Sequence, residues 1–354
     1  KNGFFYVIDR TDGQVISAEP FTDITWASHF DVETQRPVMN AEARFTEGRS
    51  LVAPSPLGGH GWHAMSFNPE TGLAYYPAIH ATYVYSDPPG DLSQWRSTPW
   101  IGGTGVAGGF GPSTREDQAY STLQAWDPVR QELAWEVPLP GIYSPGTMTT
   151  AGNLVFQGRL DGTFFAYRAD TGEELWSWDV GLGISAPPIT YSVGGTQYVA
   201  LLVGWGTVMA AIGGEFAAQY GWAYGEQKRL LVAFALDGSA TLPDQPPPTV
   251  PVAREEDFEV DAQLAARGSE LWGMCTFCHG GGAVAAGMTP DLRSSRIVAD
   301  LERFAGVVRD GERARDGMPM YQDISYDDLR ALQHYIREPR VNLLPMGIEQ
   351  LPPE

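Results

Sequence analysis

Short apolar runs separated by turn residues dominate the first two thirds of the chain. The clearest runs lie at residues 4–8, 153–157, 163–167 and 198–203. Residue pairs typical of tight turns lie among them, namely Asp12-Gly13, Asp161-Gly162, Thr171-Gly172 and Gly194-Gly195. Runs of this length bounded by turns predict β-strands, and no convincing helical period is visible before residue 238.

A strand–turn–strand unit repeats within this region. Residues 125–135 align with residues 166–176, which places Trp135 and Trp176 41 positions apart. Residues 7–16 and 67–73 resemble the same unit more weakly. A period near 40 residues built from short strands is typical of a β-propeller blade. An ordinary antiparallel sandwich with similar hairpins is the alternative.

The pattern changes after residue 238. Five prolines interrupt the polar residues 239–256, which is typical of a semi-rigid spacer between domains. Apolar residues then recur with helical spacing at 258–272, 297–309 and 325–338. The sequence therefore predicts a mainly β domain over 1–238, a linker over 239–256 and a small all-α domain over 257–354.

Composition and charge limit the partners that this chain can have. The 41 glycines and 27 prolines occur with 11 Trp, 15 Tyr and 15 Phe among 354 residues, which favours a turn-rich β protein over disorder. With 23 basic and 43 acidic side chains the net charge is −20. That charge repels nucleic acid and favours a basic protein partner. No apolar stretch approaches the roughly 20 residues that span a bilayer.

Cys275 and Cys278 are the only cysteines, and His279 follows them directly. This Cys-x-x-Cys-His pattern is the attachment signature of c-type haem. Two thiols one helical turn apart can add to the two vinyl groups of one porphyrin, and the next imidazole can reach the iron. A redox dithiol and half of a zinc site are the alternatives.

A second axial ligand is expected for an electron-transferring haem, and it is commonly a methionine. Met318 stands between Gly317 and Pro319, 39 residues after His279 and just before the last predicted helix. Since Pro319 favours an extended loop, we predict that Met318 is the second iron ligand. The alternatives are Met320, Met288 and Met274.

The sequence resembles a known enzyme family over nearly its whole length. Residues 1–10, Lys-Asn-Gly-Phe-Phe-Tyr-Val-Ile-Asp-Arg, are similar to a strand of quinohaemoprotein alcohol dehydrogenases. In that family an eight-bladed propeller that binds pyrroloquinoline quinone (PQQ) is fused to a cytochrome c domain. The similarity continues at residues 25–27, 58–69 and 203–206, and the units ending at Trp135 and Trp176 match the family's tryptophan-docking motif. Residues 255–340 resemble a class I cytochrome c domain.

The resemblance implies roles for several residues of the first domain. Lys1 matches the lysine that hydrogen-bonds and polarises the quinone oxygens. Trp62 matches a tryptophan beside the cofactor, and Trp205 lies in the matching Gly-Trp-Gly loop. Gly61 stands where the family has asparagine, so one cofactor hydrogen bond is lost there. His60 and His63 also form an H-x-x-H pair, but a strand–loop segment lacks the helix that would align them on a metal.

Other family features lie upstream of the Lys-Asn-Gly strand, namely the adjacent-cysteine disulfide, the Ca²⁺ ligands and the catalytic aspartate. Eight blades also need more than the 238 residues before the linker. The resemblance therefore implies that the chain is the C-terminal half of a longer enzyme. A shortened propeller of four or five blades is the alternative.

The function expected from this resemblance is that of a periplasmic oxidoreductase. PQQ in the propeller, with Ca²⁺ bound upstream, would oxidise a small alcohol. Electrons would leave through haem c to a basic acceptor such as a cytochrome or cupredoxin. The alternative, from a different class, is an electron-transfer cytochrome on a non-catalytic propeller.

Overall fold

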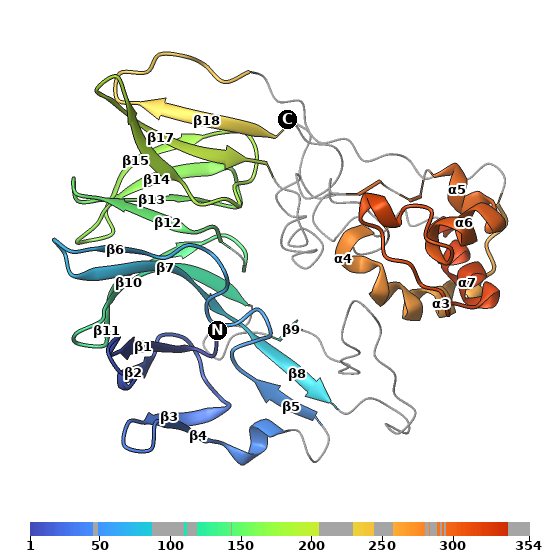
Figure 1. The fold of residues 1–354 in the computed structure, drawn as a ribbon, viewed down its shortest axis with the longest axis horizontal. Coiled ribbons are helices and arrows are strands. Elements are labelled where there is room, and N and C mark those ends of the chain that lie inside the picture. The colour runs from blue at the N-terminus through green and yellow to red at the C-terminus, as the bar shows by residue number, and fades with distance from the viewer. Residues whose placement is uncertain are drawn as a thin grey trace. The chain divides into compact units, whose positions relative to one another are not determined.

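The chain is seen here in a computed structural model. It describes residues 1–44, 49–86, 110–111, 119–142, 144–204, 229–243, 258–279, 283, 289–290, 292–293 and 295–338. These residues fall into two compact units, one of strands and one of helices (Figure 1). The predicted class, mainly β with a small helical domain at the C-terminal end, is confirmed. The predicted linker lies outside the described residues from position 244 onward.

Antiparallel sheets make up the strand unit. One four-stranded sheet, in the order β11-β10-β7-β6, is formed by β6 (Ser66–Asn68), β7 (Leu73–His80), β10 (Tyr120–Asp127) and β11 (Glu132–Leu139). Another follows in chain order with β12 (Thr147–Thr150), β13 (Leu154–Gly158), β14 (Thr163–Arg168) and β15 (Glu174–Asp179). A three-stranded sheet comprises β16 (Ile189–Val193), β17 (Thr196–Val203) and β18 (Leu230–Ala235).

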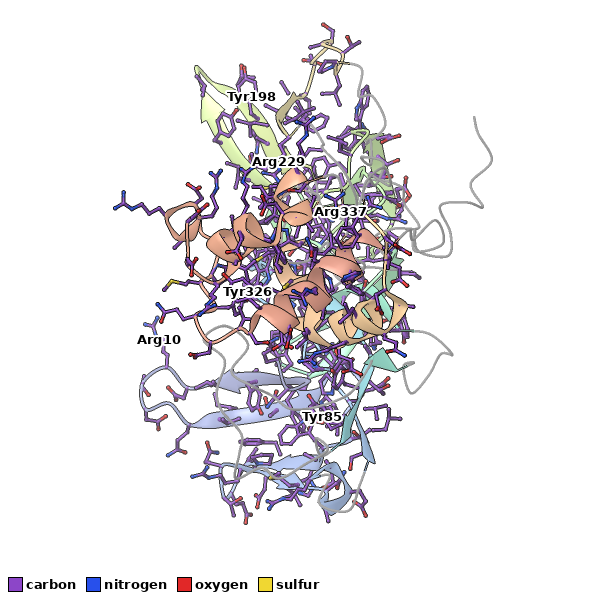
Figure 2. The ribbon with its side chains drawn as sticks, turned by 90° about the vertical axis from the view of Figure 1, so that its right-hand side faces the viewer. Arg10, Tyr85, Tyr198, Arg229, Tyr326 and Arg337 are labelled. Carbon is purple, nitrogen blue, oxygen red and sulfur yellow. The ribbon has the colours of Figure 1, made fainter. Side chains whose placement is uncertain are left out.

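Smaller sheets form the start of this unit. They are β1 (Phe4–Ile8) with β2 (Val15–Pro20), β3 (Ala27–Asp31) with β4 (Arg36–Met39), and β8 (Thr82–Ser86) between β5 (Arg49–Val52) and β9 (Phe110–Gly111). A short 3-10 helix, η1 (Ala41–Arg44), precedes β5. Arg10 lies in the turn that joins β1 to β2, and its side chain is labelled in Figure 2.

Neighbouring sheets of the strand unit pack face to face. Tyr75 and Tyr76 of β7 point to opposite faces because side chains alternate along a strand. Tyr76 meets Phe5 of β1, with ring centroids 5.7 Å apart. Tyr75 packs in a buried cluster with Phe165 and Tyr167 of β14. Successive sheets joined in this way, stacked in Figure 1, are neighbouring propeller blades rather than the two layers of a sandwich.

The sequence repeat reappears as a repeated β-bulge. In three hairpins the pairing register shifts by one residue shortly before the turn. The shifts lie at Val7/Ile8 in β1, Ala125/Trp126 in β10 and Ala166/Tyr167 in β14. These positions coincide in the sequence alignment of the units. The predicted strand–turn–strand repeat is therefore confirmed.

One tryptophan of the repeat locks two blades together. Trp135 of β11 donates its indole N–H to the carbonyl of Ala169, 3.0 Å away in the turn before β15. Gly172 of that turn has a left-handed φ of +76°, and a Cβ placed there would lie 2.6 Å from the Trp135 ring. Glycine is therefore required both by the turn and by the ring that docks on it.

We expect Gly172→Ala to destabilise the strand unit by about 3 kcal/mol, because it combines a left-handed backbone with an overpacked contact. Gly13→Ala is the matched control, since Gly13 has a φ of +81° and nothing within 4 Å of its built Cβ. The control should cost only about 1 kcal/mol. Urea unfolding followed by tryptophan fluorescence measures both, and equal losses would contradict the docking role of Trp135.

The helical unit contains short helices around one core. Its elements are α3 (Ala262–Leu271), η3 (Trp272–Met274), α4 (Thr276–His279), α5 (Arg296–Ala299), α6 (Leu301–Val308), η5 (Ala314–Asp316) and α7 (Tyr326–Arg337). The last matches the predicted helix within a residue at each end, and the Ser325 hydroxyl accepts from the Asp328 amide as its N-cap.

Two predicted helices begin or continue differently in the structure. The first was expected from residue 258, but α3 begins at Ala262 because Asp261 accepts the amides of Gln263 and Leu264 as N-cap. The helix expected over 297–309 is two helices, α5 and α6. Asp300 separates them, since its side chain caps α6 by accepting the amides of Glu302 and Arg303.

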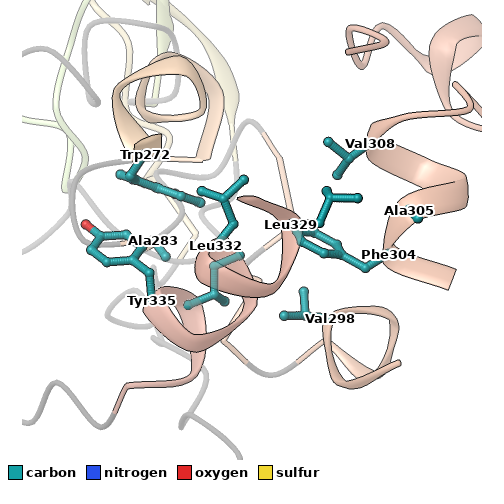
Figure 3. Close-up of a cluster of buried hydrophobic side chains, with 10 residues drawn as sticks. Trp272, Ala283, Val298, Phe304, Ala305, Val308, Leu329, Leu332 and Tyr335 are labelled. Atoms are coloured by element: carbon teal, nitrogen blue, oxygen red, sulfur yellow. The ribbon is translucent and has the colours of Figure 1, made fainter. Parts of the chain in front are cut away.

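Packing between α3 and α7 holds the helical unit together. Trp272 and Tyr335 lie with ring centroids 5.3 Å apart at one side of the core, with Leu329 and Leu332 of α7 buried within it (Figure 3). The two helices cross at Gly268, where a built Cβ would lie 2.1 Å from the carbonyl oxygen of Ala331. Only glycine permits so close a crossing.

A buried arginine side chain also ties this unit together. Arg337 at the end of α7, labelled in Figure 2, is 7% exposed and donates to the carbonyls of Arg293 and Ser295. These bonds join α7 to the segment before α5.

Candidate cofactor sites

Cys275, Cys278 and His279 lie together on one helical turn, as predicted. The amides of Cys278 and His279 both donate to the carbonyl of Cys275, at 3.1 and 2.9 Å. Both cysteines are free thiols and are partly exposed. Burial raises the pKa of Cys275 to about 12, and the neighbouring Cys278 adds to the rise. The Cys275 thiol is therefore neutral at neutral pH.

The neutral ring of His279 is held in one tautomer by a residue that the motif does not include. The Thr289 hydroxyl donates its proton to the carbonyl of Cys278 at 2.6 Å, so its oxygen accepts from His279 Nδ1, which is 3.2 Å away. The carbonyl of Pro290 lies 3.4 Å from the same nitrogen. This network assigns the proton to Nδ1 and the lone pair to Nε2. Nε2 is therefore the nitrogen that suits an iron.

Met318 is positioned by the loop that carries it. Gly317 before it is left-handed, with φ of +92°, and the Met318 amide donates to the carbonyl of Arg313 at 3.2 Å. Beyond the loop, the Tyr321 amide donates to the carbonyl of Val308 in α6 at 2.8 Å. Both ends of the loop are thus fixed by backbone hydrogen bonds.

The methionines considered as iron ligands have different surroundings. Met318 is partly buried and packs against the same core cluster as Cys275. Met320 is 39% exposed, and its sulfur accepts from Gln322 Nε2 at 3.5 Å. Met288 and the side chain of Met274 lie outside the described residues. These surroundings favour Met318 over Met320, and its ligand role stays a prediction.

The donor set of the helical unit fits haem c. It offers two thiols on one turn, an imidazole with its lone pair on Nε2 and a thioether on an anchored loop. Among the residues that the structure describes, no group of three or more His, Cys, Asp or Glu side chains is arranged to hold a metal ion. The predicted Ca²⁺ ligands were placed upstream of the chain and are not tested.

Lys1 stands at the start of β1 beside a cavity. Its Nζ donates to the carbonyls of Pro56 and Leu57 at 3.0 and 2.7 Å, which leaves one N–H without a partner among the described residues. Burial lowers the pKa of Lys1. The cavity, of about 180 Å³, has a mainly aromatic lining that includes Lys1, Phe5, Phe21, His60, Met65 and Tyr76. An ammonium with a donor to spare fits the polarising role predicted for it.

The segment between Gly58 and β6 carries the other predicted quinone contacts. Trp62 is 64% exposed and stacks on His63, with ring centroids 4.4 Å apart. Gly61 precedes it and offers no side-chain donor. The nitrogens of His60 face the carbonyls of Pro77 and His63, at 2.7 and 3.1 Å. Trp205 lies outside the described residues, so its predicted role is untested.

Comparison with known proteins decides the family. Residues 14–199 match the model of the PQQ family described as glucose/ethanol/alcohol dehydrogenase, β-propeller domain. The chain belongs to this family. Residues 263–336 match a second model, described as cytochrome c oxidase, cbb3-type, subunit III. The resemblance to quinohaemoprotein alcohol dehydrogenases is confirmed, and family membership implies PQQ and haem c as cofactors, with Ca²⁺ typical of the family.

Similar proteins extend well beyond this chain. Quinohemoprotein alcohol dehydrogenase ADH IIB of Pseudomonas putida is 41% identical over 95% of the chain and 48% of its own length. The solved structure of ADHIIG from Pseudomonas putida HK5 matches with a TM-score of 0.82 at 34% identity, covering 99% of this chain and 51% of that one. The Comamonas testosteroni enzyme gives 0.72 at 35%, covering 95% and 49%. The chain thus spans about half the length of the relatives it matches.

Sequence reasoning missed the residues that support the ligands. Thr289 lies ten positions after His279, and no local pattern marks it as the partner of the imidazole. The burial of His63 was also not predicted, because no local sequence pattern separates it from the exposed Trp62 before it. No helix in the described part of the chain has the length and apolar character to cross a membrane.

The buried His63 should make stability depend on pH. Burial lowers its pKa to about 4, with smaller effects of His60 and Lys1, whereas an unfolded chain binds the proton near pH 6.5. Between these values unfolding takes up a proton, so acid favours the unfolded chain. From pH 7 to pH 5 this one group should cost about 2 kcal/mol.

Urea unfolding of the wild type and of His63→Phe at both pH values measures this effect. The difference between the proteins isolates His63 from other titrating groups. The wild type should lose about 2 kcal/mol more than the variant between pH 7 and pH 5. Equal losses would show that the His63 imidazole takes up protons in the folded chain.

Proposed function

We propose that this chain is the C-terminal half of a periplasmic quinohaemoprotein alcohol dehydrogenase. The observation that carries the proposal is one chain in which a PQQ-family propeller is followed by a haem-attachment turn whose histidine is held with its lone pair on Nε2. PQQ, when bound, supplies oxidation of an alcohol to an aldehyde with loss of two electrons and two protons, and haem c supplies one-electron transfer.

Lys1 is the residue of this chain that would act on the quinone. Its ammonium is fixed by two backbone carbonyls, so it approaches a bound oxygen without first being ordered. A donor held in this way stabilises negative charge that develops on that oxygen. The lowered pKa of Lys1 also favours giving up a proton there. The carboxylate that removes the alcohol's proton would come from the upstream half.

The helical unit would hold the haem and set its potential. Cys275 and Cys278 would form the thioethers, and His279 Nε2 and the Met318 sulfur would be the protein ligands of the iron. A thioether ligand favours ferrous iron and raises the potential. The hydrogen bond from Nδ1 to Thr289 fixes the orientation of the histidine ring.

The apolar face at the end of the strand unit supports an upstream half. Leu202 of β17 and Leu231 of β18 are directly paired, yet they are 61% and 71% exposed. Ile189 and Val193 of β16 are 58% and 62% exposed. In the preceding sheets such faces are covered by a neighbouring blade. We propose that a blade from upstream residues covers this one.

The electron acceptor would be a basic cytochrome or cupredoxin. The net charge of −20 attracts such a partner before contact, and salt screens that attraction. An electron-transfer cytochrome on a non-catalytic propeller is the second candidate. Gly61 favours it, because this residue supplies none of the cofactor contact expected from asparagine.

The test uses the full-length natural polypeptide, reconstituted with PQQ and Ca²⁺. Adding a primary alcohol should reduce the haem only in the loaded enzyme, and acid–acetone should leave the haem attached to the protein. The variant Cys275→Ala/Cys278→Ala should lose covalent haem but still reduce an artificial dye. PQQ-independent haem reduction, or none with any alcohol, would support the second candidate instead.

Two further measurements sharpen this test. Peptide mapping of the full-length polypeptide after reaction with an amine-reactive reagent should show that PQQ protects Lys1. Lys228 serves as the internal control. Reduction of a basic cytochrome should slow as salt rises, whereas reduction of an acidic one should not.

Replacing Met318 tests the assignment of the second iron ligand. Met318→Ala should keep the haem attached, because the thioethers and His279 remain. It should abolish the sulfur-to-iron charge-transfer band of the ferric protein and lower the haem potential. Met320→Ala is the matched control and should keep both. If the control loses the band and Met318→Ala retains it, the ligand is Met320.

A further inference from the structure

Met320 lies at the surface of the loop that carries Met318. Its side chain is 39% exposed, whereas Met318, two residues earlier, is partly buried against the core of the helical unit. A thioether at a protein surface is open to oxidation by peroxides, and packing against a core protects the sulfur. The two methionines of this loop therefore differ in their access to an oxidant.

The Met320 side chain lies directly on a glycine that follows α6. Gly311 is left-handed, with φ of +76°, and a Cβ built there would lie 2.8 Å from the Met320 sulfur and 3.2 Å from the Met320 Cβ. Only glycine leaves room for the thioether at this place. The contact is therefore close and apolar, and an oxygen added to the sulfur would disturb it.

This contact helps to close the Met318 loop against α6. Next to Met320, the Tyr321 amide donates to the carbonyl of Val308, the last residue of α6, at 2.8 Å. Met320 thus lies between this bond and the residue expected to bind the iron. A change in the shape or polarity of Met320 acts on the segment that presents Met318.

Gln322 offers an oxidised sulfur a polar partner. Its Nε2 donates to the Met320 sulfur at 3.5 Å, although a thioether is only a weak acceptor. Oxidation converts the apolar thioether into a polar sulfoxide, whose oxygen is a stronger acceptor. Oxidation therefore strengthens the contact with Gln322 and weakens the one with Gly311.

We propose that Met320 is a peroxide-sensitive modification site that controls how firmly the Met318 loop closes. The sulfur attacks one oxygen of hydrogen peroxide, the O–O bond breaks, and a sulfoxide and water form. The sulfur loses two electrons, which the peroxide gains, and a methionine sulfoxide reductase reverses the change. The proposal rests on the function proposed above, because it concerns regulation of the haem site.

The oxidised loop should open more often but remain closed most of the time. The charge-transfer band of the ferric protein should therefore persist, as expected for Met320→Ala. A competing ligand binds only when Met318 is off the iron, so its apparent affinity rises with the open fraction. Imidazole should bind the ferric haem about tenfold more tightly after oxidation.

The test treats the full-length polypeptide, with its haem attached, with dilute hydrogen peroxide at neutral pH. Peptide mass spectrometry should find a sulfoxide at Met320 about as fast as at Met39, which is 49% exposed in the strand unit. Oxidation of Met318 should be at least about tenfold slower. Titration with imidazole before and after treatment then measures loop opening, and a methionine sulfoxide reductase should restore the original affinity.

Two variants separate oxidation from packing. Met320→Leu keeps the apolar bulk but cannot form a sulfoxide, so peroxide should leave its imidazole affinity unchanged. Met320→Gln places a polar group against Gly311 and should bind imidazole about tenfold more tightly without peroxide. Met39→Leu is the matched control, which should respond to peroxide as the wild type does.

Hydrogen exchange follows the loop without relying on the haem. The Tyr321 amide should exchange about tenfold faster in the oxidised wild type and in Met320→Gln, but not in peroxide-treated Met320→Leu. If the natural polypeptide carries no haem, the proposed function fails. The exchange of Tyr321 then still decides whether Met320 controls the loop.

Three results would overturn the proposal. In the first, Met320 stays unoxidised while Met39 reacts. In the second, the sulfoxide forms at Met320 but neither imidazole affinity nor Tyr321 exchange changes. In the third, the peroxide effect persists in Met320→Leu, which would assign it to another residue.

Discussion

Each sheet of the strand unit depends on its neighbour to cover an apolar face. Tyr75 and Tyr76 show this within two residues, since one packs toward β14 and the other toward β1. Trp135 adds a directed contact by donating to Ala169 in the adjacent blade. Because blades hold each other, the segments between them are fixed as well. The segment around Trp62 contains no helix or strand, and its hydrogen bonds to β7 and β12 hold it in place.

In the helical unit, backbone hydrogen bonds hold the candidate ligand residues in place, where packing between sheets does so in the strand unit. Its proposed ligands come from one helical turn and one loop, and backbone hydrogen bonds hold both segments. The amides after Cys275 close the turn, and the Met318 loop is pinned at Arg313 and Val308. The side chain of Thr289 then decides which nitrogen of His279 carries the proton. A site ordered beforehand needs little rearrangement when iron changes its charge.

Local patterns predicted much of this from sequence, and non-local contacts account for what was missed. Cys275, Cys278 and His279 are close in sequence, so their spacing alone places them on one turn. Hairpins were predictable because each turn and its strands are contiguous. Helix ends were not, since Asp300 interrupts a continuous apolar period by capping α6. The partners of His279 and Trp62 were missed for another reason. Thr289 meets His279 only in the folded helical unit, and His63 becomes buried only when the strand unit folds.

Because residue 61 is a glycine, the contacts that other residues could make with a cofactor become more important. A glycine has no side chain that could donate to a cofactor or restrict the tryptophan that follows it, so under the proposed function other residues would have to place a planar group. Lys1 can fix one oxygen through its remaining N–H, but a single point contact does not determine the plane of a ring. Under the proposed function, the mainly aromatic lining of the cavity beside Lys1 would have to supply the remaining constraints on that ring.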